Sequence, residues 1–163
     1  MKYQVNGEIV EVITYKNEYR RDFERLNLEW IEKFFDLEDA DKAVFADPSG
    51  KIIAPGGQIY FVLENGQVKG TCAVLKISDA SYELAKMAVI PSAQGKGFGD
   101  LLMNAAIAFA KEKGASELIL STNTKLQSAI KLYEKHGFKT LPIISDNRYK
   151  RVDIMMRLPL PKK

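Results

Sequence analysis

Three glycines within six residues constrain this chain more than any other feature of its sequence. The segment is Gln94-Gly95-Lys96-Gly97-Phe98-Gly99, and it lies between an apolar run that stops at Pro91 and a stretch with helical periodicity. Glycine lets a ligand approach the main chain without meeting a Cβ, and the first N–H groups of a helix have no partner within it. The segment therefore predicts an anion site, with a phosphate as the natural ligand and the ammonium of Lys96 adding charge. A tight strand-to-helix turn without a ligand is the alternative.

The glycine spacing separates this turn from better-known phosphate loops. A P-loop requires Gly-x-x-x-x-Gly-Lys-Ser/Thr, and dinucleotide and kinase loops require Gly-x-Gly-x-x-Gly. Here the residue three places after Gly97 is Asp100. The sequence therefore disfavours nucleotide hydrolysis and hydride transfer.

The composition predicts one globular domain over residues 1–163. Hydrophobic residues make up 46% and charged residues 28% of the 163, so one core can form without a disulfide or a metal. A single cysteine, Cys72, and a single histidine, His136, offer no zinc ligand set, and we expect no metal. No signal-peptide core is seen, and the longest apolar run, 105–110, is too short for a membrane helix. We expect a cytoplasmic protein with no membrane partner.

The charges are distributed unevenly. The net charge of +3 is too small for a typical nucleic-acid-binding domain, so we expect no nucleic-acid partner. Residues 1–81 hold 10 basic and 14 acidic side chains, whereas residues 82–163 hold 14 basic and 7 acidic ones, which suits an anionic ligand on the second half. Seven acidic residues from Glu29 to Asp47 could attract a cationic amine, with an ordinary solvated face as the alternative.

Hydrophobic periodicity indicates an α/β (α+β) domain with a mixed, mostly antiparallel sheet flanked by helices. The expected strands are 8–15, 58–63, 68–75, 82–90 and 117–121, a last hairpin pairs 138–142 with 152–158, and the expected helices are 18–35, 99–113 and 126–136. Asn65-Gly66 is a strong hairpin signal between two of the strands. The stretch 36–57 shows no clear period and is predicted to be an irregular loop that could cover a site.

The glycine segment also resembles motif A of the GCN5-related N-acetyltransferases (GNAT). Gln94, Gly97 and Gly99 fill the pattern Gln/Arg-x-x-Gly-x-Gly/Ala of that family. Two further segments are similar to the central strand and the second signature of the family, namely 83–91 and 129–138. The resemblance implies the GNAT fold, with a splayed strand pair at the cofactor site and acetyl-CoA as cosubstrate.

The resemblance divides the chain and assigns the cofactor site. Residues 58–158 match well and would form the core with the acetyl-CoA site, whereas residues 1–57 match in outline and would form the acceptor side. The glycine turn would hold the pyrophosphate on its backbone amides, and the pantetheine would run along the central strand. The implied cofactor-binding residues are Met87, Ala88, Val89, Gln94, Gly95, Lys96, Gly97, Phe98, Gly99 and Asn123.

Two catalytic roles follow from the resemblance. Tyr133 would give a proton to the coenzyme A sulfur, although its helical spacing with Leu126 and Ile130 also suits a core position. Glu83 would be the general base, with a water chain or a merely solvated glutamate as alternatives. By strand alternation Glu83 shares a face with Met87, unless a bulge changes the parity.

Other candidates have structural explanations. His136 suits the C-terminal end of a helix, where its charge complements the helix dipole. Cys72 is expected to be buried rather than nucleophilic, because no histidine is evidently placed to activate it. Arg148, Lys150 and Arg151 either flank the coenzyme phosphate or belong to a solvated hairpin.

The sequence thus predicts an N-acetyltransferase that acts on a primary amine, with direct attack in a ternary complex. A small-molecule amine is the expected acceptor, and a homodimer is possible. The alternatives are acetylation of a protein or peptide at its N-terminus or a lysine, and a catalytically silent module that binds acetyl-CoA as a sensor.

Overall fold

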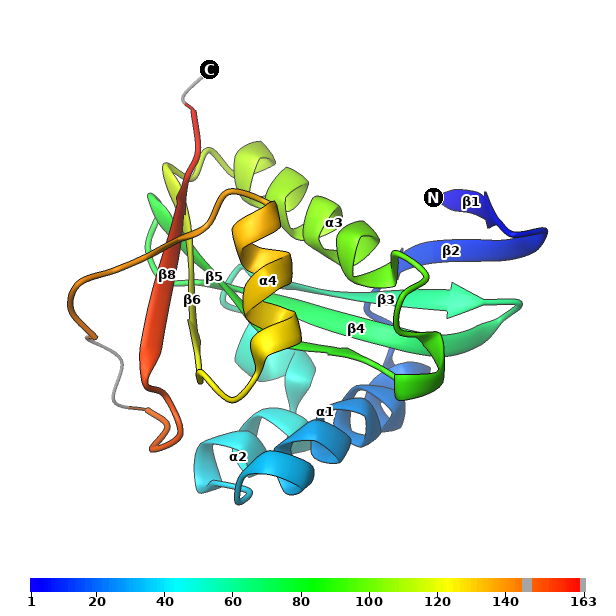
Figure 1. Ribbon diagram of the computed structural model, residues 1–163, viewed down its shortest axis with the longest axis horizontal. Coiled ribbons are helices and arrows are strands. Elements are labelled where there is room, and N and C mark those ends of the chain that lie inside the picture. The colour runs from blue at the N-terminus through cyan, green and yellow to red at the C-terminus, as the bar shows by residue number, and fades with distance from the viewer. Residues whose placement is uncertain (145–147, 162–163) are drawn as a thin grey trace.

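The computed structural model describes residues 1–144 and 148–161, and these form one sheet with helices on both faces (Figure 1). The strand order in the described residues is β1-β2-β3-β4-β5-β6-β8-β7, and every neighbouring pair is antiparallel except β5 and β6. The strands are β1 (Lys2–Val5), β2 (Glu8–Thr14), β3 (Gln58–Glu64), β4 (Gln67–Lys76), β5 (Ser81–Val89), β6 (Glu117–Thr122), β7 (Lys139–Thr140) and β8 (Ile154–Pro159). The predicted mixed, mostly antiparallel sheet is confirmed.

The helices cover the sheet in two layers, with α1 and α2 on one face and α3 and α4 on the other (Figure 1). They are α1 (Arg20–Phe34), α2 (Asp39–Ala46), α3 (Phe98–Glu112) and α4 (Gln127–Lys135), with short turns of helix at Asn17–Tyr19, Ser49–Ile53 and Pro91–Ala93. Within the described part of the chain, no helix combines the length and apolar character needed to cross a bilayer.

Alternation along the central strands produces two cores. Ile59 and Phe61 of β3 pack with the α1 and α2 side chains, while the alternate residues Tyr60 and Val62 face the other layer. On that other face Val62 and Cys72 pack with Leu102 of α3 and its neighbours. Burial on both faces makes the middle of the sheet a rigid support for whatever is attached to its edges.

The strands β5 and β6 separate soon after they pair. Their parallel ladder covers three residue pairs, from Ser81 opposite Glu117 to Glu83 opposite Ile119. Beyond Glu83, β6 continues to pair with β8 but no longer with β5. The β6-facing edge of β5 from Leu84 onward therefore has no ladder partner in the described residues, which is the splayed pair that the family resemblance implies.

A bulge in β5 changes the predicted parity of this strand. Lys86 has a positive φ of 53°, and the register with β4 shifts beside it, between Thr71 and Ala73. Glu83 lies before the bulge and Met87 after it, and the extra residue reverses the alternation. Lys86 therefore contacts α2, whereas Met87 packs at the core under α3. The expectation that Glu83 and Met87 share one face by simple alternation is wrong.

Two elements were not predicted. The stretch 36–57 is not an irregular loop, because it contains α2 and the turn of π-helix at Ser49–Ile53. The eight residues of α2 are too few to show a helical period, and its first turn is held by reciprocal side-chain bonds between Glu38 and Asp41. β1 was also missed, although Asn6-Gly7 turns with φ values of 52° and 81°, much like the 50° and 81° of Asn65-Gly66.

Candidate active site

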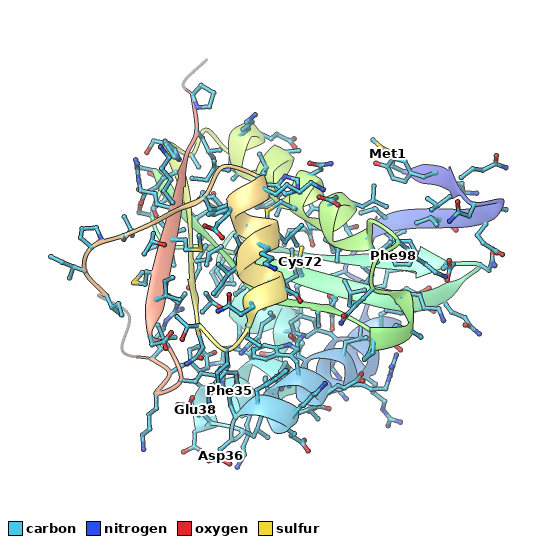
Figure 2. All side chains as sticks on the ribbon, in the orientation of Figure 1. Met1, Phe35, Asp36, Glu38, Cys72 and Phe98 are labelled. Atoms are coloured by element: carbon cyan, nitrogen blue, oxygen red, sulfur yellow. The ribbon has the colours of Figure 1, made fainter. Side chains whose placement is uncertain are left out.

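One cleft of about 920 Å³ runs from the glycine turn, past the gap between β5 and β6, to the layer of α1. We call the two ends the turn end, lined by Gly95, Gly97 and Gly99, and the far end, lined by Trp30, Phe35, Tyr149 and Arg151. Phe98 and Phe35, which lie at the two ends, are well separated in Figure 2. Glu83 and Tyr133 both line the same cleft.

The turn end has the properties of a phosphate site. α3 begins at Phe98 with no side chain capping its first turn, so the N–H groups there are available to a ligand. Gly95 and Gly97 have φ values of 87° and 83°, which L side chains rarely adopt, and no atom lies within 4 Å of a Cβ added to either. At Gly99 an added Cβ would stand 2.9 Å from Leu132 of α4. Two glycines thus serve the backbone conformation, and the third serves helix packing.

The side chains of Gln94, Lys96 and Phe98 are held by contacts within the fold. The ammonium of Lys96 lies 3.1 Å from a carboxylate oxygen of Glu64, and its side chain is not part of the cleft lining. The charge expected from Lys96 at the phosphate site is therefore paired on β3 instead. Gln94 donates its side-chain amide to the carbonyl of Val89 at 3.3 Å, and Phe98 is buried in the core. At the turn itself, the groups left for an anion are therefore backbone N–H groups rather than the Lys96 ammonium.

The residues expected to hold the pantetheine flank the gap between the splayed strands. Met87, Ala88 and Val89 line the cleft along β5. Asn123, which follows β6, also lines it, but its amide group is already engaged. Its nitrogen donates to the carbonyl of Arg151 at 2.7 Å, and its oxygen accepts from the main chain of Lys125 at 2.8 Å. Asn123 therefore joins the two loops at the end of the gap.

Tyr133 of α4 is a buried phenol at the cleft wall. Only 8% of its surface is exposed, and its ring lies 6.0 Å from that of Phe138. Burial raises the pKa of Tyr133, so the hydroxyl is protonated at neutral pH and can act as a proton donor. His136 ends α4 and lies 2.8 Å from Asp100 through Nε2, which is the structural position that the sequence predicts.

Cys72 has no catalytic environment. It is completely buried on β4, with Sγ 3.7 Å from the carbonyl of Leu102. Burial raises the pKa of its thiol, so the nucleophilic thiolate is suppressed. The expected structural role of Cys72 is confirmed.

Glu83 lies in the cleft beside an arginine. Its side chain is 3% exposed, and the guanidinium of Arg148 donates to Oε2 at 2.5 Å. Arg148 comes from the loop before β8, and its guanidinium lies at Glu83 of β5. The sequence hypothesis that Arg148 flanks the coenzyme phosphate stays a prediction.

Behind the far end lies a buried ionic network centred on Asp41 of α2. This carboxylate is fully buried, accepts two hydrogen bonds from Arg151 at 2.7 and 2.6 Å, and contacts the ammonium of Lys86. Burial alone would raise the pKa of Asp41, but the Arg151 hydrogen bonds and the Lys86 charge outweigh it and lower the pKa to about 2. For Lys86 burial dominates and lowers its pKa, while Asp41 opposes that shift.

Tyr149 completes the network. The cationic groups of Lys86 and Arg151 each lie 4.5 Å from the centre of its ring, and Lys86 also donates to its hydroxyl at 3.3 Å. The pKa of Tyr149 is raised to about 12, mainly because the side chain is buried. Sequence reasoning missed Lys86 and Tyr149, and no local pattern marks them, because their partners come from distant segments of the chain.

The predicted acidic surface is not formed at the cleft. Of the seven carboxylates between Glu29 and Asp47, only Glu29 lines it. Asp41 is neutralised by its two cations, Glu38 accepts from the main chain of Lys150 at 2.8 Å, and Asp47 accepts from that of Gly50 at 3.0 Å. At the far end this segment thus contributes the carboxylate of Glu29, because most of the other carboxylates hold the fold or face away.

Comparison with known proteins agrees with this geometry. The model of the acetyltransferase (GNAT) family matches residues 15–138. "Uncharacterized N-acetyltransferase YvbK" of Bacillus subtilis is 32% identical over 126 residues, which cover 76% of this chain and 81% of that protein. An "uncharacterized N-acetyltransferase" of Schizosaccharomyces pombe is 30% identical over 146 residues, covering 86% and 88%.

Solved structures share the fold. A GNAT-family acetyltransferase of Staphylococcus aureus superposes with a TM-score of 0.85 at 19% identity, covering 93% of this chain and 99% of that one. The putative acetyltransferase yncA of Salmonella typhimurium, solved with acetyl-CoA, gives a TM-score of 0.76 at 17% identity, covering 94% and 95%. The chain belongs to the GNAT family, whose members are acetyl-CoA-dependent N-acetyltransferases. It is a GNAT-type enzyme.

Proposed function

We propose that this enzyme moves the acetyl group of acetyl-CoA to a primary amine of a small molecule, in a ternary complex. Residues 1–163 would act as one domain, in which residues 1–57 shape the acceptor side. The observation that carries the proposal is the continuity of the cleft, which leads from the glycine turn past Glu83 and Tyr133 to the aromatic residues of the far end. Two substrates can meet there without a covalent enzyme intermediate.

The backbone would hold the cosubstrate. The uncapped first turn of α3 supplies N–H groups and the positive end of a helix dipole for the pyrophosphate. Among the residues that the structure describes, the edge of β5 beyond Glu83 has no strand partner on the β6 side, and it would supply main-chain donors and acceptors for the amide groups of the pantetheine. Both contacts direct the thioester into the gap beside Tyr133.

The transfer needs three proton movements. The amine arrives as an ammonium, because its pKa is about 10, and Glu83 takes one proton from it and passes that proton to solvent. The nitrogen attacks the thioester carbonyl and the new C–N bond forms, after which the nitrogen gives a second proton to Glu83. The C–S bond breaks and Tyr133 protonates the departing sulfur. The second proton passes from Glu83 through solvent to the Tyr133 oxygen, which restores both residues. The net products are an amide, free coenzyme A and one proton.

The far end supports a small acceptor. The loop that carries Tyr149 and Arg151 is tied to α2 through the buried Asp41, so it forms a fixed wall at this end of the cleft. A folded protein would need a groove that remains open along its length. A compact amine can instead enter beside the Arg148 side chain, which is 44% exposed.

Two measurements test the proposal. Acetyl-CoA at 100 times its Kd should stabilise the protein by about 2.7 kcal/mol, whereas ATP and NAD at the same concentration should not. Thiol release should then appear with small amines. Stabilisation without thiol release from a broad amine panel would favour the sensor, and release only with peptides would favour a protein acetyltransferase. Stabilisation by NAD or ATP alone would refute an acetyl-CoA site.

Substitutions test the catalytic residues. Tyr133→Phe should lower kcat about 100-fold at pH 7 with little change in acetyl-CoA affinity, because it removes only the proton donor. Tyr82→Phe is the matched control, since Tyr82 is also a buried tyrosine but does not line the cleft. Glu83→Gln should lower kcat/KM for the amine and restore part of it at high pH, where free amine is abundant. Equal rates for Tyr133→Phe and the control would exclude the proposed acid.

A further inference from the structure

The far end of the cleft is an aromatic wall in which positive charges lie beside the rings. The wall consists of Trp30, Phe34, Phe35 and Tyr149. Figure 2 shows Phe35 on the side of the sheet that α1 and α2 cover, away from the glycine turn. We propose that the acceptor is a monoamine with an aromatic group, which packs against this wall while its amine reaches the gap between β5 and β6. The inference rests on the proposed function and names the substrate class of the same site.

The rings that α1 contributes to the wall are fixed by contacts within the fold. The indole nitrogen of Trp30 donates to the side-chain oxygen of Asn27 at 2.9 Å. Asn27 is itself fully buried, and its amide donates to the main-chain oxygen of Phe23 at 2.9 Å. Phe35 meets the indole edge to face with ring centres 6.3 Å apart, and Phe34 lies 6.3 Å from Phe35. A flat ligand therefore meets rings that are already ordered, which lowers the entropic cost of binding.

Tyr149 is fixed by the buried network around Asp41. The cationic groups of Lys86 and Arg151 each lie 4.5 Å from the centre of its ring, and Asp41 binds both cations. The Arg151 guanidinium also lies 5.4 Å from the ring centre of Trp30, so one cation is shared between two rings of the wall. Buried groups thus hold both halves of the aromatic wall in place.

Positive charge predominates around the cleft, which disfavours an acceptor with several ammonium groups. The cationic side chains of the cleft lining are those of Lys33, Lys86, Lys125, Arg148 and Arg151, and the acidic ones are those of Glu29, Glu83 and Asp100. Among the described residues, Lys33 and Lys125 form no ion pair with a carboxylate. A polyamine would bring its further ammonium groups toward these like charges, whereas a monoamine brings its one ammonium to Glu83.

The same cations favour an aromatic ring over a saturated ring of equal size. The ammonium of Lys33 lies 5.3 Å from the ring centre of Phe34. That of Lys125 lies 5.5 Å from the ring centre of Phe35. A cation attracts the negative face of an aromatic ring, and Arg151 shows that one cation of this wall can contact two rings. An aromatic ligand would gain such contacts, whereas a saturated ring would gain only burial.

Three amines test the substrate class: phenethylamine, cyclohexylethylamine and putrescine. The first two carry rings of similar size on the same arm, and putrescine carries a second ammonium instead of a ring. The measured quantity is kcat/KM for thiol release, calculated for the free amine so that differences in basicity cancel. We expect phenethylamine to exceed cyclohexylethylamine about 3-fold or more and putrescine about 10-fold or more. An equal or higher value for either of these two would overturn the inference and leave the acetyltransferase function intact.

Trp30→Leu tests the wall itself. It should raise the KM for phenethylamine about 5-fold or more and change the KM for acetyl-CoA little, because the ring contact is lost. Tyr15→Leu is the matched control, since Tyr15 is also a half-buried aromatic residue packed against the same core but lies outside the cleft lining. Thermal unfolding checks that both variants are folded. An equal rise of this KM in the two variants would refute the contact with the wall.

Lys125→Gln tests the cations of the wall. It should lower the ratio of kcat/KM for phenethylamine to that for cyclohexylethylamine about 2-fold or more, because one cation–π contact is lost. Lys113→Gln is the matched control: the Lys113 ammonium also lies 5.5 Å from a ring centre, that of Phe109, but Lys113 is not part of the cleft lining. An unchanged ratio in Lys125→Gln, or an equal fall in the control, would count against the aromatic preference.

A binding measurement separates this inference from the catalytic proposal. Trp30 is the single tryptophan of the chain and lines the cleft, so its fluorescence reports binding at the wall without turnover. Titration of phenethylamine into the wild-type protein with coenzyme A should change the emission along a saturating curve, and putrescine should not. An emission change without thiol release would remove the catalytic proposal alone. No emission change with phenethylamine would overturn the inference, whether or not other amines are acetylated.

Discussion

Asp41→Asn should destabilise this enzyme more than any exposed charge change, because Asp41 is a fully buried carboxylate that holds two cations. The neutral amide keeps the shape but leaves Lys86 and Arg151 without their shared counter-charge. Removing one partner from a buried ion pair costs about 3–5 kcal/mol. For a chain of this size the melting temperature should fall by roughly 6–20 °C, at about 2–4 °C per kcal/mol.

The pH dependence gives an independent check. The folded-state pKa of Asp41 is about 2, below its ordinary value of 3.8, so its ionisation stabilises the folded state above pH 4. The shift corresponds to roughly 2 kcal/mol, and this contribution is lost as the pH falls from about 4 toward 2. The difference in unfolding free energy between the wild type and Asp41→Asn should therefore shrink over that interval.

Urea unfolding followed by circular dichroism at pH 7 and at several values below 4 would measure both effects. Asp39→Asn is the matched control, since Asp39 lies on the same helix, is fully exposed and is 3.9 Å from Lys42. We expect it to change stability little, because exposed ion pairs contribute little. Adding Lys86→Met to Asp41→Asn should recover part of the loss. A change of less than 1 kcal/mol for Asp41→Asn at pH 7 would refute the reasoning.

Three further predictions concern the glycine turn and the cysteine. Gly97→Ala should raise the KM for acetyl-CoA and change the KM for the amine little, as measured by initial-rate kinetics. The reason is that a Cβ at a φ of 83° costs about 1–2 kcal/mol in the turn conformation. Gly99→Ala should lower the urea-unfolding free energy by about 1–3 kcal/mol through its contact with Leu132, and Leu132→Ala in the same chain should relieve that contact. Cys72 should react with a maleimide far more slowly in the native protein than in denaturant, because it is buried and its pKa is raised. Fast native labelling would contradict its placement.

Local chemistry explains which elements were predictable. Asn65-Gly66 requires two residues with positive φ, which these residue types provide, and the hairpin forms where the sequence predicts it. The glycine turn and α3 were predicted for a similar reason. α2 was missed because eight residues are too few for a period, and its first turn is held by unusual acidic side chains. The bulge at Lys86 carries no signal in the sequence, so the parity of β5 could not be predicted.

The sequence alone was sufficient for the family, which its short motifs resemble. It was also sufficient for the order of most elements and the glycine turn, because these depend on glycine conformations and hydrophobic periods within short segments. Only the tertiary structure decided which charges meet. Along the chain, Lys86 follows Asp41 by 45 residues and Arg151 follows Lys86 by 65 residues. The three side chains come together through the packing of α2, the β5 bulge and the loop before β8. Long-range electrostatic partners are selected by burial, and burial is a property of the assembled fold.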